Sequence, residues 1–409
     1  MDKKTETILE KRKLTQIKRQ TQVCRVFELK IDESKLSKKD QEKLKMFFVE
    51  AKWIYNHILG LQDINIFNFN YKNLTIVDVL NKDREVEQRE LKYLPAKQRQ
   101  DVIFLMRDSI KSLAKKKEKG KVGKLKFKSE YKSLELSQYG ITHKIVGNKV
   151  KINGIKKPLK VYGLDQIKPY MEIANGKLVK KPSGYYILLT TYSNKPIKMN
   201  NNLKKEVGLD FGIKTSITTS EREKFNISIG ESERLKRLQR KLSKKKKGSN
   251  NRYKLILKIR KEHEKITNKK KDKSNKVISY LLTNYSRIYI QDENLVGWQK
   301  GLFGKQVQHS CLGTIKKKLI EKKNQCYIID RFLPTTKYCF KCGKEVEITL
   351  NERVFKCECG YIEDRDIKAA KTVLYFGKIN NIQIPMEHRE FKPVEKISIQ
   401  VDNICKNFW

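Results

Sequence analysis

Four closely spaced cysteines constrain the fold of this chain more than any other feature. Cys339 and Cys342 form a C-x-x-C pair, and Cys357 and Cys359 form a C-x-C pair after 14 intervening residues. Two close pairs of thiolates are the ligand set of a structural zinc ribbon. The other four cysteines are scattered along the chain, so a metal site is favoured over a disulfide framework.

The glycines that follow these pairs support the same interpretation. Gly343 comes directly after the first pair, and Gly360 comes directly after the second. A glycine allows the tight turn that points backbone N–H groups at a metal-bound sulfur. We therefore expect zinc to be bound by all four cysteines, with a structural role.

The charge of the chain is strongly positive. Its 409 residues include 92 Lys and Arg against 46 Asp and Glu, which gives a formal net charge of +46. Such a chain needs a polyanion to screen it, and nucleic acid is the first expectation, with an anionic membrane surface as the alternative. No run approaches the ~20 apolar residues of a membrane-spanning helix. The start, MDKKTETILEKRK, lacks the apolar core of a secretory signal, so we expect a cytoplasmic location.

The first half of the chain is predicted to contain strands interrupted by helices. Residues 1–21 are basic and polar and are expected to form an arm or a lead into a strand, which follows at residues 22–31. Apolar residues recur at steps of three and four from Ser37 to about Lys117, which predicts helices. Residues 119–202 contain short Val-, Ile- and Tyr-rich runs separated by glycines, which predict strands and hairpins.

The second half is predicted to alternate strands and helices. Strands are expected in EVGLDFGIKTSITTS, KFNISIG, SRIYIQDE and QCYIIDRF, because each has a short apolar run next to a turn signal. Helices are expected near residues 309–323 and from Asp366 onward. Residues 376–409 show no clear pattern.

A basic segment at residues 231–285 has a helical pattern. Between Arg234 and Lys276 there are 20 Lys and Arg against three acids, together with an apolar stripe, and KKKKGSNN breaks the pattern into a helical hairpin. A charged run is usually a solvated helix face. The density of charge here favours a phosphate-binding surface instead. The candidate contacts are Arg240, Lys241, Lys244, Lys245, Lys246 and Lys247.

Three carboxylates stand at positions where a sheet edge can bring them together. Asp210 ends an apolar strand before a glycine turn, Glu293 follows another apolar strand, and Asp366 begins a helix. Each signal alone is weak, because an Asp at a strand end is usually a turn residue. Converging carboxylates bind divalent cations, and two such ions can clamp the attacking and leaving oxygens of a phosphodiester. Asp292 is a close competitor of Glu293.

These features together resemble the TnpB family, the RNA-guided nucleases encoded by insertion sequences. VGLDFGIKT, DENL and EDRDIKAA resemble the three RuvC motifs, and the DENL and DRD registers select Glu293 and Asp366. RLKRLQRKLSKKKKGSNNR and HEKITNKKKD resemble the basic hairpin of the family, and FLPTTKYCFKCG resembles the lead into its ribbon. AKWIYNHIL and GKLKFKSE in the first half also resemble TnpB.

The resemblance implies a fold of class α/β plus β. An RNase H-like (RuvC) nuclease domain with an inserted zinc ribbon would follow a wedge β-barrel that carries a helical recognition insertion. The implied parts are the wedge at 1–36 and 121–203, the insertion at 37–120, the nuclease at 204–335 and 362–378, the ribbon at 336–361 and a tail at 379–409.

The resemblance also implies an RNA-guided DNA endonuclease of a prokaryotic cytoplasm, acting at the nucleoid. Guide RNA and double-stranded and single-stranded target DNA would be the partners, and a short target-adjacent motif would be read by the first half. Asp210, Glu293 and Asp366 would hold Mg²⁺ or Mn²⁺ and carry the cleavage, and the four cysteines would hold Zn²⁺.

Two positions depart from the family pattern, and other functions stay open. Lys368 stands where DRDxNAA has Asn, which could disturb the carboxylates electrostatically, and Leu125 replaces the usual Pro. A compact type V CRISPR effector shares the same plan. A guide-dependent DNA-binding repressor would be expected to lose carboxylates, and a transposase that acts on DNA by itself is a further alternative.

Overall fold

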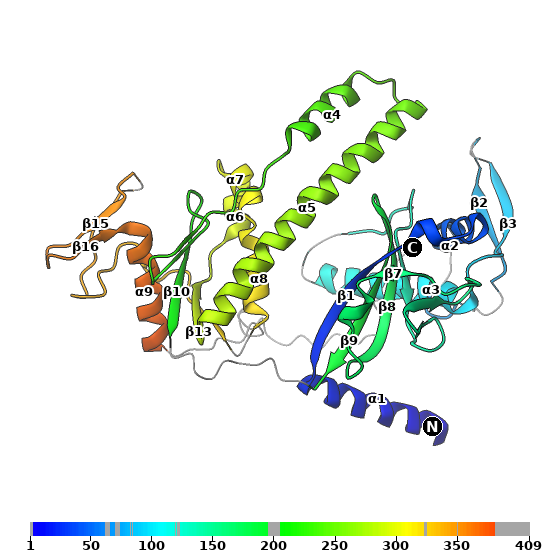
Figure 1. The fold of residues 1–409 in the computed structure, drawn as a ribbon, viewed down its shortest axis with the longest axis horizontal. Helices are drawn as coiled ribbons and strands as arrows, with labels where there is room; N and C mark the ends of the chain where they lie inside the picture. The colour runs from blue at the N-terminus through cyan, green and yellow to red at the C-terminus, as the bar shows by residue number, and fades with distance from the viewer. Residues whose placement is uncertain are drawn as a thin grey trace. The chain divides into compact units, whose positions relative to one another are not determined.

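The structure is a computed structural model of the chain (Figure 1). It describes residues 3–61, 66–69, 74–81, 83, 85–118, 120, 123–194, 205–322, 325–349 and 351–380. The described residues divide into two compact units, one up to Asn194 and one from Lys205 to Asn380. In the described residues, no helix has both the length and the apolar character needed to cross a membrane.

A five-stranded antiparallel sheet forms the centre of the first unit, in the order β4-β8-β9-β1-β7. The long strands are β1 (Val23–Ile31), β8 (Glu172–Lys181) and β9 (Gly184–Ser193), and the edges are β4 (Ser133–Leu136) and β7 (Val161–Tyr162). Alternate residues of these strands are buried because successive side chains point to opposite faces. The strand predicted at residues 22–31 and those predicted within 119–202 are confirmed.

Two helices pack with this sheet. α2 (Lys38–Gly60) begins at Ser37, whose hydroxyl oxygen accepts the backbone N–H of Asp40 at 3.1 Å, and α3 (Ala96–Glu118) follows later. The helical prediction for Ser37 to Lys117 is therefore confirmed at both ends. It is wrong in the middle, where β2 (Ile76–Leu80) and β3 (Val86–Glu90) form a hairpin. The β-branched run TIV has a strand preference that the helical pattern of the flanking residues concealed.

The prediction for residues 1–21 is also wrong, because α1 (Lys3–Thr21) is a helix. Near its end, Lys18 and Arg19 bind the carboxylate of Glu172, and the Arg19 guanidinium lies 3.7 Å from the centre of the Tyr192 ring. These contacts to β8 and β9 hold a helix that lacks the apolar stripe by which a helix is recognised in a sequence. A small hairpin, β5 (His143–Val146) with β6 (Lys149–Ile152), completes the regular structure of the unit.

The second unit is built on a mixed five-stranded sheet in the order β12-β11-β10-β13-β14. β10 (Glu206–Phe211) runs parallel to β13 (Arg287–Gln291), which runs parallel to β14 (Cys326–Ile329). β11 (Ile217–Thr219) and β12 (Lys224–Phe225) extend the sheet in antiparallel fashion. All five strands fall in segments where the sequence predicts them.

Helices cover both faces of this sheet. Apolar side chains of α5 (Asn250–Asn284) and α8 (Leu312–Ile320) form one core with the strands, and α9 (Arg365–Asn380) packs on the other face through Val373. Glycines let α9 lie directly on the sheet: a Cβ at Gly208 would collide with the Ala370 carbonyl, and one at Gly377 would collide with Tyr289. This close packing fixes the position of Asp366 in the first turn of α9.

The remaining elements of the second unit are short or extend from the sheet. α4 (Glu233–Ser243) and the first half of α5 form the predicted helical hairpin, which extends beyond the sheet in Figure 1. α6 (Leu295–Lys300) and α7 (Gly304–Ser310) precede α8, and only α8 matches the helix predicted near 309–323. β15 (Val354–Lys356) pairs with β16 (Ile362–Asp364) beside the cysteines. α9 continues to Asn380, beyond residue 376, where the sequence pattern ends; residues 381–409 lie outside the described residues.

Candidate functional site

The three carboxylates predicted from the sequence lie at one edge of the second sheet. Asp210 is the penultimate residue of β10, and Glu293 follows β13 by two residues. β10 and β13 are parallel, with Leu209 opposite Ile290, so their carboxyl ends meet at the same edge. Asp366 reaches this edge from α9, which packs on β10 and β13.

The electrostatics of Asp210 show that the three carboxylates act on one another. Burial raises the pKa of Asp210 well above its usual value, and the charges of Asp366 and Glu293 raise it further, against an opposing effect of Arg365. A carboxylate in such surroundings is unfavourable unless it binds a cation. The sheet edge therefore concentrates negative charge that a divalent cation would stabilise.

The structure also distinguishes Glu293 from its neighbour Asp292. The Asp292 carboxylate binds Lys316 Nζ at 2.8 Å and an Arg331 Nη atom at 2.7 Å, so it is engaged by two cations. Burial raises the pKa of Glu293, partly offset by the charge of Lys316. Lys316 also donates to the Glu293 backbone carbonyl at 2.7 Å, which fixes the turn that presents this side chain. Asp292 thus anchors the turn through two ion pairs.

The start of α9 orients Asp366. Asp364 Oδ1 accepts the backbone N–H groups of Asp366 and Ile367 at 3.0 and 3.1 Å, which caps the helix. The Asp366 carboxylate lies 3.8 Å from Arg365 Nε and 4.0 Å from Arg353 Nη1. Its place in the first helical turn is favourable for an anion because the helix dipole is positive there.

The donor set of this edge suits Mg²⁺ or Mn²⁺, which prefer carboxylate oxygens. Among the described residues, the three carboxylates form no group whose ligand atoms all lie within 4.8 Å of one another.

The four cysteines do form such a group. Cys339 Sγ lies 3.7 Å from Cys359 Sγ, and Cys342 Sγ lies 3.5 Å from Cys357 Sγ. Tetrahedral coordination with Zn–S bonds of about 2.3 Å places sulfurs about 3.8 Å apart, so the arrangement fits zinc. Gly343 and Gly360 adopt φ values of +78° and +83°, the left-handed turn conformation expected from the sequence.

Backbone N–H groups favour the thiolate form of Cys339, whereas burial and hydrogen bonds with the other cysteines raise the pKa of Cys357 to about 12. Burial tends to raise the pKa of Cys339, but hydrogen bonds from the backbone of Cys342 and Lys341 outweigh it and lower the pKa to about 7. A thiolate is the form that binds metal. The aromatic rings of Phe355 and Tyr361 pack with Cys339 and Cys357 into the small core of this segment.

Lys368, the departure from DRDxNAA, does not point at the carboxylates. Its buried ammonium donates to the carbonyls of Thr335 and Thr336 at 3.1 and 2.8 Å and lies 4.1 Å from the centre of the Phe355 ring. Burial lowers its pKa to about 8, and the charges of nearby cysteines oppose this effect. The side chain therefore joins α9 to the segment that leads into the cysteines.

This connection continues to β13. The Thr335 hydroxyl donates to Gln291 Oε1 at 2.8 Å, and Gln291 is the last residue of β13, two positions before Glu293. The elements that carry Glu293 and Asp366 are thus joined by a buried polar network of Gln291, Thr335 and Lys368. A fully satisfied network of this kind makes a site rigid.

Two regions of the chain match known family profiles. Residues 190–297 match the family described as a probable transposase, OrfB_IS605. Residues 311–373 match the Cas12f1-like TNB domain. The first match contains Asp210 and Glu293, and the second contains Asp366 and the four cysteines.

Similar proteins have names that agree with these profiles. The chain is 32% identical over 183 residues to a Streptomyces pristinaespiralis protein named "Putative RNA-guided DNA endonuclease", covering 42% of this chain and 45% of that one. It is 30% identical over 194 residues to a "Putative transposase" of Acanthamoeba polyphaga mimivirus, covering 42% and 39%. It is 29% identical over 140 residues to a TnpB-like protein of the same virus, covering 29% and 25%.

The chain resembles the TnpB family. It spans less than half the length of these curated relatives. A chain from a cryo-EM structure of a Cas12f1–sgRNA–target DNA complex also aligns with the structure, with a TM-score of 0.47 and 12% identity, over 86% of this chain and 99% of that one.

The two TnpB-like motifs of the first unit lie together. Asn56, in AKWIYNHIL, donates to the Lys128 carbonyl at 2.9 Å and accepts the Lys128 backbone N–H at 2.8 Å. Lys128 belongs to GKLKFKSE, and its ammonium lies 3.8 Å from the centre of the Tyr55 ring and 4.4 Å from that of Tyr131. The motifs thus form one structural unit.

The TnpB-like basic hairpin exposes its positive charge. Ser249 caps α5, and Arg252 Nη1 donates to the Leu242 carbonyl at 2.7 Å, which holds the turn between the helices. The six candidate phosphate contacts are exposed, and no ion pair is found for them in the part of the chain that the structure describes: Arg240, Lys241, Lys244, Lys245, Lys246 and Lys247.

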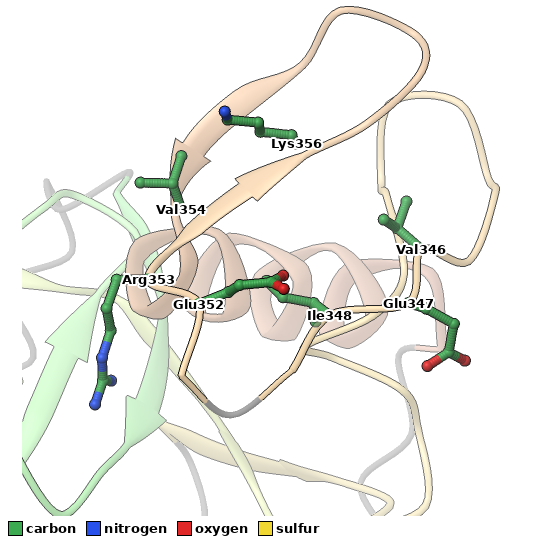
Figure 2. A pocket seen from close by; sticks show the side chains of 7 residues that line it. All are labelled: Val346, Glu347, Ile348, Glu352, Arg353, Val354 and Lys356. Carbon is green, nitrogen blue, oxygen red and sulfur yellow. The ribbon is translucent and has the colours of Figure 1, made fainter.

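A pocket of about 310 Å³ lies beside the cysteine segment, and none of the three carboxylates lines it. Figure 2 shows the seven side chains that line it: Val346, Glu347, Ile348, Glu352, Arg353, Val354 and Lys356. Its lining mixes both charge signs, and Arg353 and Glu347 point in different directions in Figure 2. The pocket therefore provides no convergent set of functional groups.

Several residues that shape the site have no recognisable signal in the sequence. Lys316 and Arg331 hold the turn before Glu293, and Gln291 anchors the network behind it. Lys316 lies in a KKK run whose members look alike in the sequence, so no signal distinguished it. Arg365 stands between Asp364 and Asp366 in the DRD motif, and only the packing of α9 on β10 brings its charge near Asp210.

Proposed function

We propose that this chain is a TnpB-like RNA-guided DNA endonuclease that cuts DNA next to a short target-adjacent motif by metal-dependent phosphodiester hydrolysis. The similarity to a protein named as an RNA-guided DNA endonuclease supports this function. The observation that carries it is the gathering of Asp210, Glu293 and Asp366 at one sheet edge, with raised pKa values for the first two.

The proposal assigns parts of the chain to the plan that the resemblance implies. Residues 204–335 and 362–378 would form an RNase H-like nuclease, with a zinc ribbon at 336–361. The sheet order β12-β11-β10-β13-β14, with β10, β13 and β14 parallel, supports this assignment. Residues 1–36 and 121–203 would form the wedge barrel, residues 37–120 the recognition insertion, and 379–409 a tail.

In this mechanism Asp210, Glu293 and Asp366 would hold divalent cations, whose charge would favour activation of water and departure of the 3′ oxygen. Asp210 is presented by the end of β10 and Asp366 by the first turn of α9. Lys316 and Arg331 neutralise Asp292, so the turn presents Glu293 in a defined orientation. The basic hairpin binds the phosphates of guide RNA or DNA.

The first test of the function uses the purified full-length protein. RNA that co-purifies with the chain is sequenced, and DNA that matches this RNA is offered with a randomised flanking segment. We expect cleavage that requires the RNA and Mg²⁺ or Mn²⁺ and that selects a short flanking motif. RNA-dependent DNA binding without cleavage would favour a repressor, and cleavage without RNA would favour a transposase that acts alone.

The Cas12f1-like TNB match keeps a compact type V CRISPR effector as a second candidate. The same sequencing decides between the two. A guide derived from a repeat array favours the CRISPR effector, and a guide derived from a transposon end favours TnpB.

The basic hairpin provides a second prediction. Replacing Lys244 to Lys247 with Gln together should weaken binding of the co-purifying RNA, because four exposed cations are removed. The slope of log affinity against log salt should fall by ~0.7–0.9 for each phosphate that the variant no longer neutralises. Thermal stability should hold or rise, since four adjacent like charges repel one another. An unchanged slope in the folded variant would show that these lysines are only a solvated helix break.

A further inference from the structure

Phe332 is an exposed aromatic residue beside the carboxylates. It lies in the segment after β14, and 86% of its surface is exposed to solvent. A single exposed apolar side chain needs no functional explanation by itself. Phe332 does call for an explanation, because hydrogen bonds hold the segment that carries it in one conformation.

One buried amide clamps this segment. Gln291 Nε2 donates to the carbonyls of Asp330, Arg331 and Leu333 at 3.1, 3.2 and 2.9 Å. The Phe332 backbone N–H donates to Asp330 Oδ1 at 2.7 Å, which tightens the turn. The backbone carbonyls on either side of Phe332 are therefore fixed by hydrogen bonds, while its ring faces solvent. Because the backbone is already ordered, little conformational entropy is lost when the ring binds a partner.

The clamp also places Phe332 next to the carboxylate edge. β13 and β14 are parallel neighbours, with Gln291 opposite Ile329. Adjacent strands of a sheet lie about 4.8 Å apart. Glu293 and Phe332 therefore follow the same ends of two neighbouring strands. The Arg331 guanidinium reaches Asp292 at 2.7 Å, and the Asp292 backbone N–H reaches the Ile329 carbonyl at 3.2 Å. The turns that carry Phe332 and Glu293 are thus joined.

A strand of nucleic acid is the partner that fits this surface. Arg331 lies next to Phe332, and its half-exposed guanidinium, paired with Asp292, adds positive charge at the same edge, where a phosphate backbone would approach the carboxylates. Nonspecific binding of single strands combines positive charge with exposed aromatic rings, because every base has a flat face that can stack. A guided nuclease must accept any sequence at the cut, and stacking meets that requirement.

We propose that the Phe332 ring stacks on a nucleobase of the single DNA strand that the carboxylates cut, and so forms a sequence-neutral binding subsite. This inference rests on the proposed endonuclease function. Because Phe332 touches a base and not the reacting phosphate, it binds the substrate and takes no part in the chemistry.

The test compares Phe332→Trp, Phe332→Leu and Phe332→Ala in full-length protein with its co-purified RNA. Each is combined with Asp210→Asn, so that binding is measured without cleavage. The probe is a single-stranded DNA oligonucleotide with 2-aminopurine at successive positions, because stacking on a ring changes the fluorescence of this base. We expect the wild-type ring and Trp to quench one position and to bind within about twofold of each other. Leu and Ala should abolish the quench and bind about 5- to 150-fold more weakly.

The leucine variant decides between stacking and simple apolar contact. Leu keeps an apolar side chain of similar size but lacks a flat face, so binding by Phe332→Leu at the wild-type level would overturn the proposal. All three variants should melt within about 1 °C of the parent, because the ring is exposed and its removal leaves no cavity. A lower melting temperature for Leu and Ala would show instead that the ring packs against RNA or protein.

A second readout separates this inference from the proposed function. In the cleavage-competent background, Phe332→Leu and Phe332→Ala should raise KM for DNA by the same factor with little change in kcat, as expected for loss of uniform binding. If the wild-type protein with RNA cuts no DNA, the endonuclease proposal fails and the fluorescence experiment still tests Phe332. If the wild-type protein cuts DNA and all variants cut and bind equally, only the Phe332 subsite fails.

Discussion

Asp210→Ala, Glu293→Ala and Asp366→Ala should each slow DNA cleavage by at least about a thousandfold and leave binding of RNA and DNA nearly intact. Metal ions stabilise phosphoryl transition states by several kcal/mol, and each ~1.4 kcal/mol corresponds to a tenfold change in rate. Because the three side chains form one site, the Asp210→Ala/Asp366→Ala double variant should be little slower than either single variant. Single-turnover cleavage and filter binding measure the two quantities.

Asp292→Asn is the matched control for Glu293→Ala. Asp292 binds Lys316 and Arg331, so its replacement should loosen the turn and reduce cleavage about tenfold, far less than the loss of a metal ligand. Near-normal cleavage by Glu293→Ala, combined with loss in Asp292→Asn, would show that Asp292 is the ligand and that the register is wrong.

Asp210→Asn should have opposite effects on the stability of the metal-free fold and on DNA cleavage. Burial and two like charges raise the pKa of Asp210, so its charged form destabilises the metal-free fold. Removing that charge should raise the melting temperature of metal-free protein by a few degrees while cleavage is abolished. A lower melting temperature would mean that the Asp210 charge is compensated by contacts within the fold.

Removing the zinc ligands should have the second-largest effect. We expect about one zinc ion per chain, and Cys342→Ser should lower the zinc content, expose the ribbon to proteolysis and reduce cleavage at least tenfold. Structural zinc sites supply about 10–16 kcal/mol in small zinc-finger peptides, so metal loss should unfold the segment. Cleavage should fall because Lys368 and Thr335 join this segment to α9 and β13, which carry two of the carboxylates.

Cys24→Ser is the control for the loss of a thiol. Cys24 is exposed, like Cys342, but lies in β1 of the first unit and is not one of the four cysteines of the cluster. Its replacement should change neither zinc content nor cleavage. Elemental analysis that finds no zinc in fully active wild-type protein would refute the zinc assignment.

Most of the strands and helices could be predicted from the sequence, and so could the candidate site residues. The alternation around residues 22–31 and the apolar runs of β10, β13 and β14 are local sequence patterns. Such patterns predict strands without knowledge of the rest of the fold. The cysteine spacing was sufficient to predict one cluster, because two close pairs of thiols can meet around one metal with little chain rearrangement. The motif registers selected Glu293 and Asp366 through the family resemblance.

Other features depend on contacts that no local pattern contains. α1 is held by Lys18 and Arg19 against strands more than 150 residues away, so its polar sequence predicted no helix. The hairpin of β2 and β3 lies between two helices whose pattern was extended across it.

At the site, the sequence determined which residue types are available, and tertiary structure decided how they are used. Asp292 and Glu293 are adjacent acids in the sequence, and only the approach of Lys316 and Arg331 from other elements gives one of them a structural role. From the sequence, Lys368 could act on the carboxylates near it in the chain, but its long side chain reaches the carbonyls of Thr335 and Thr336 instead. The reason in both cases is that the energy of a buried charge depends on its partners across the fold, not on its neighbours in the chain.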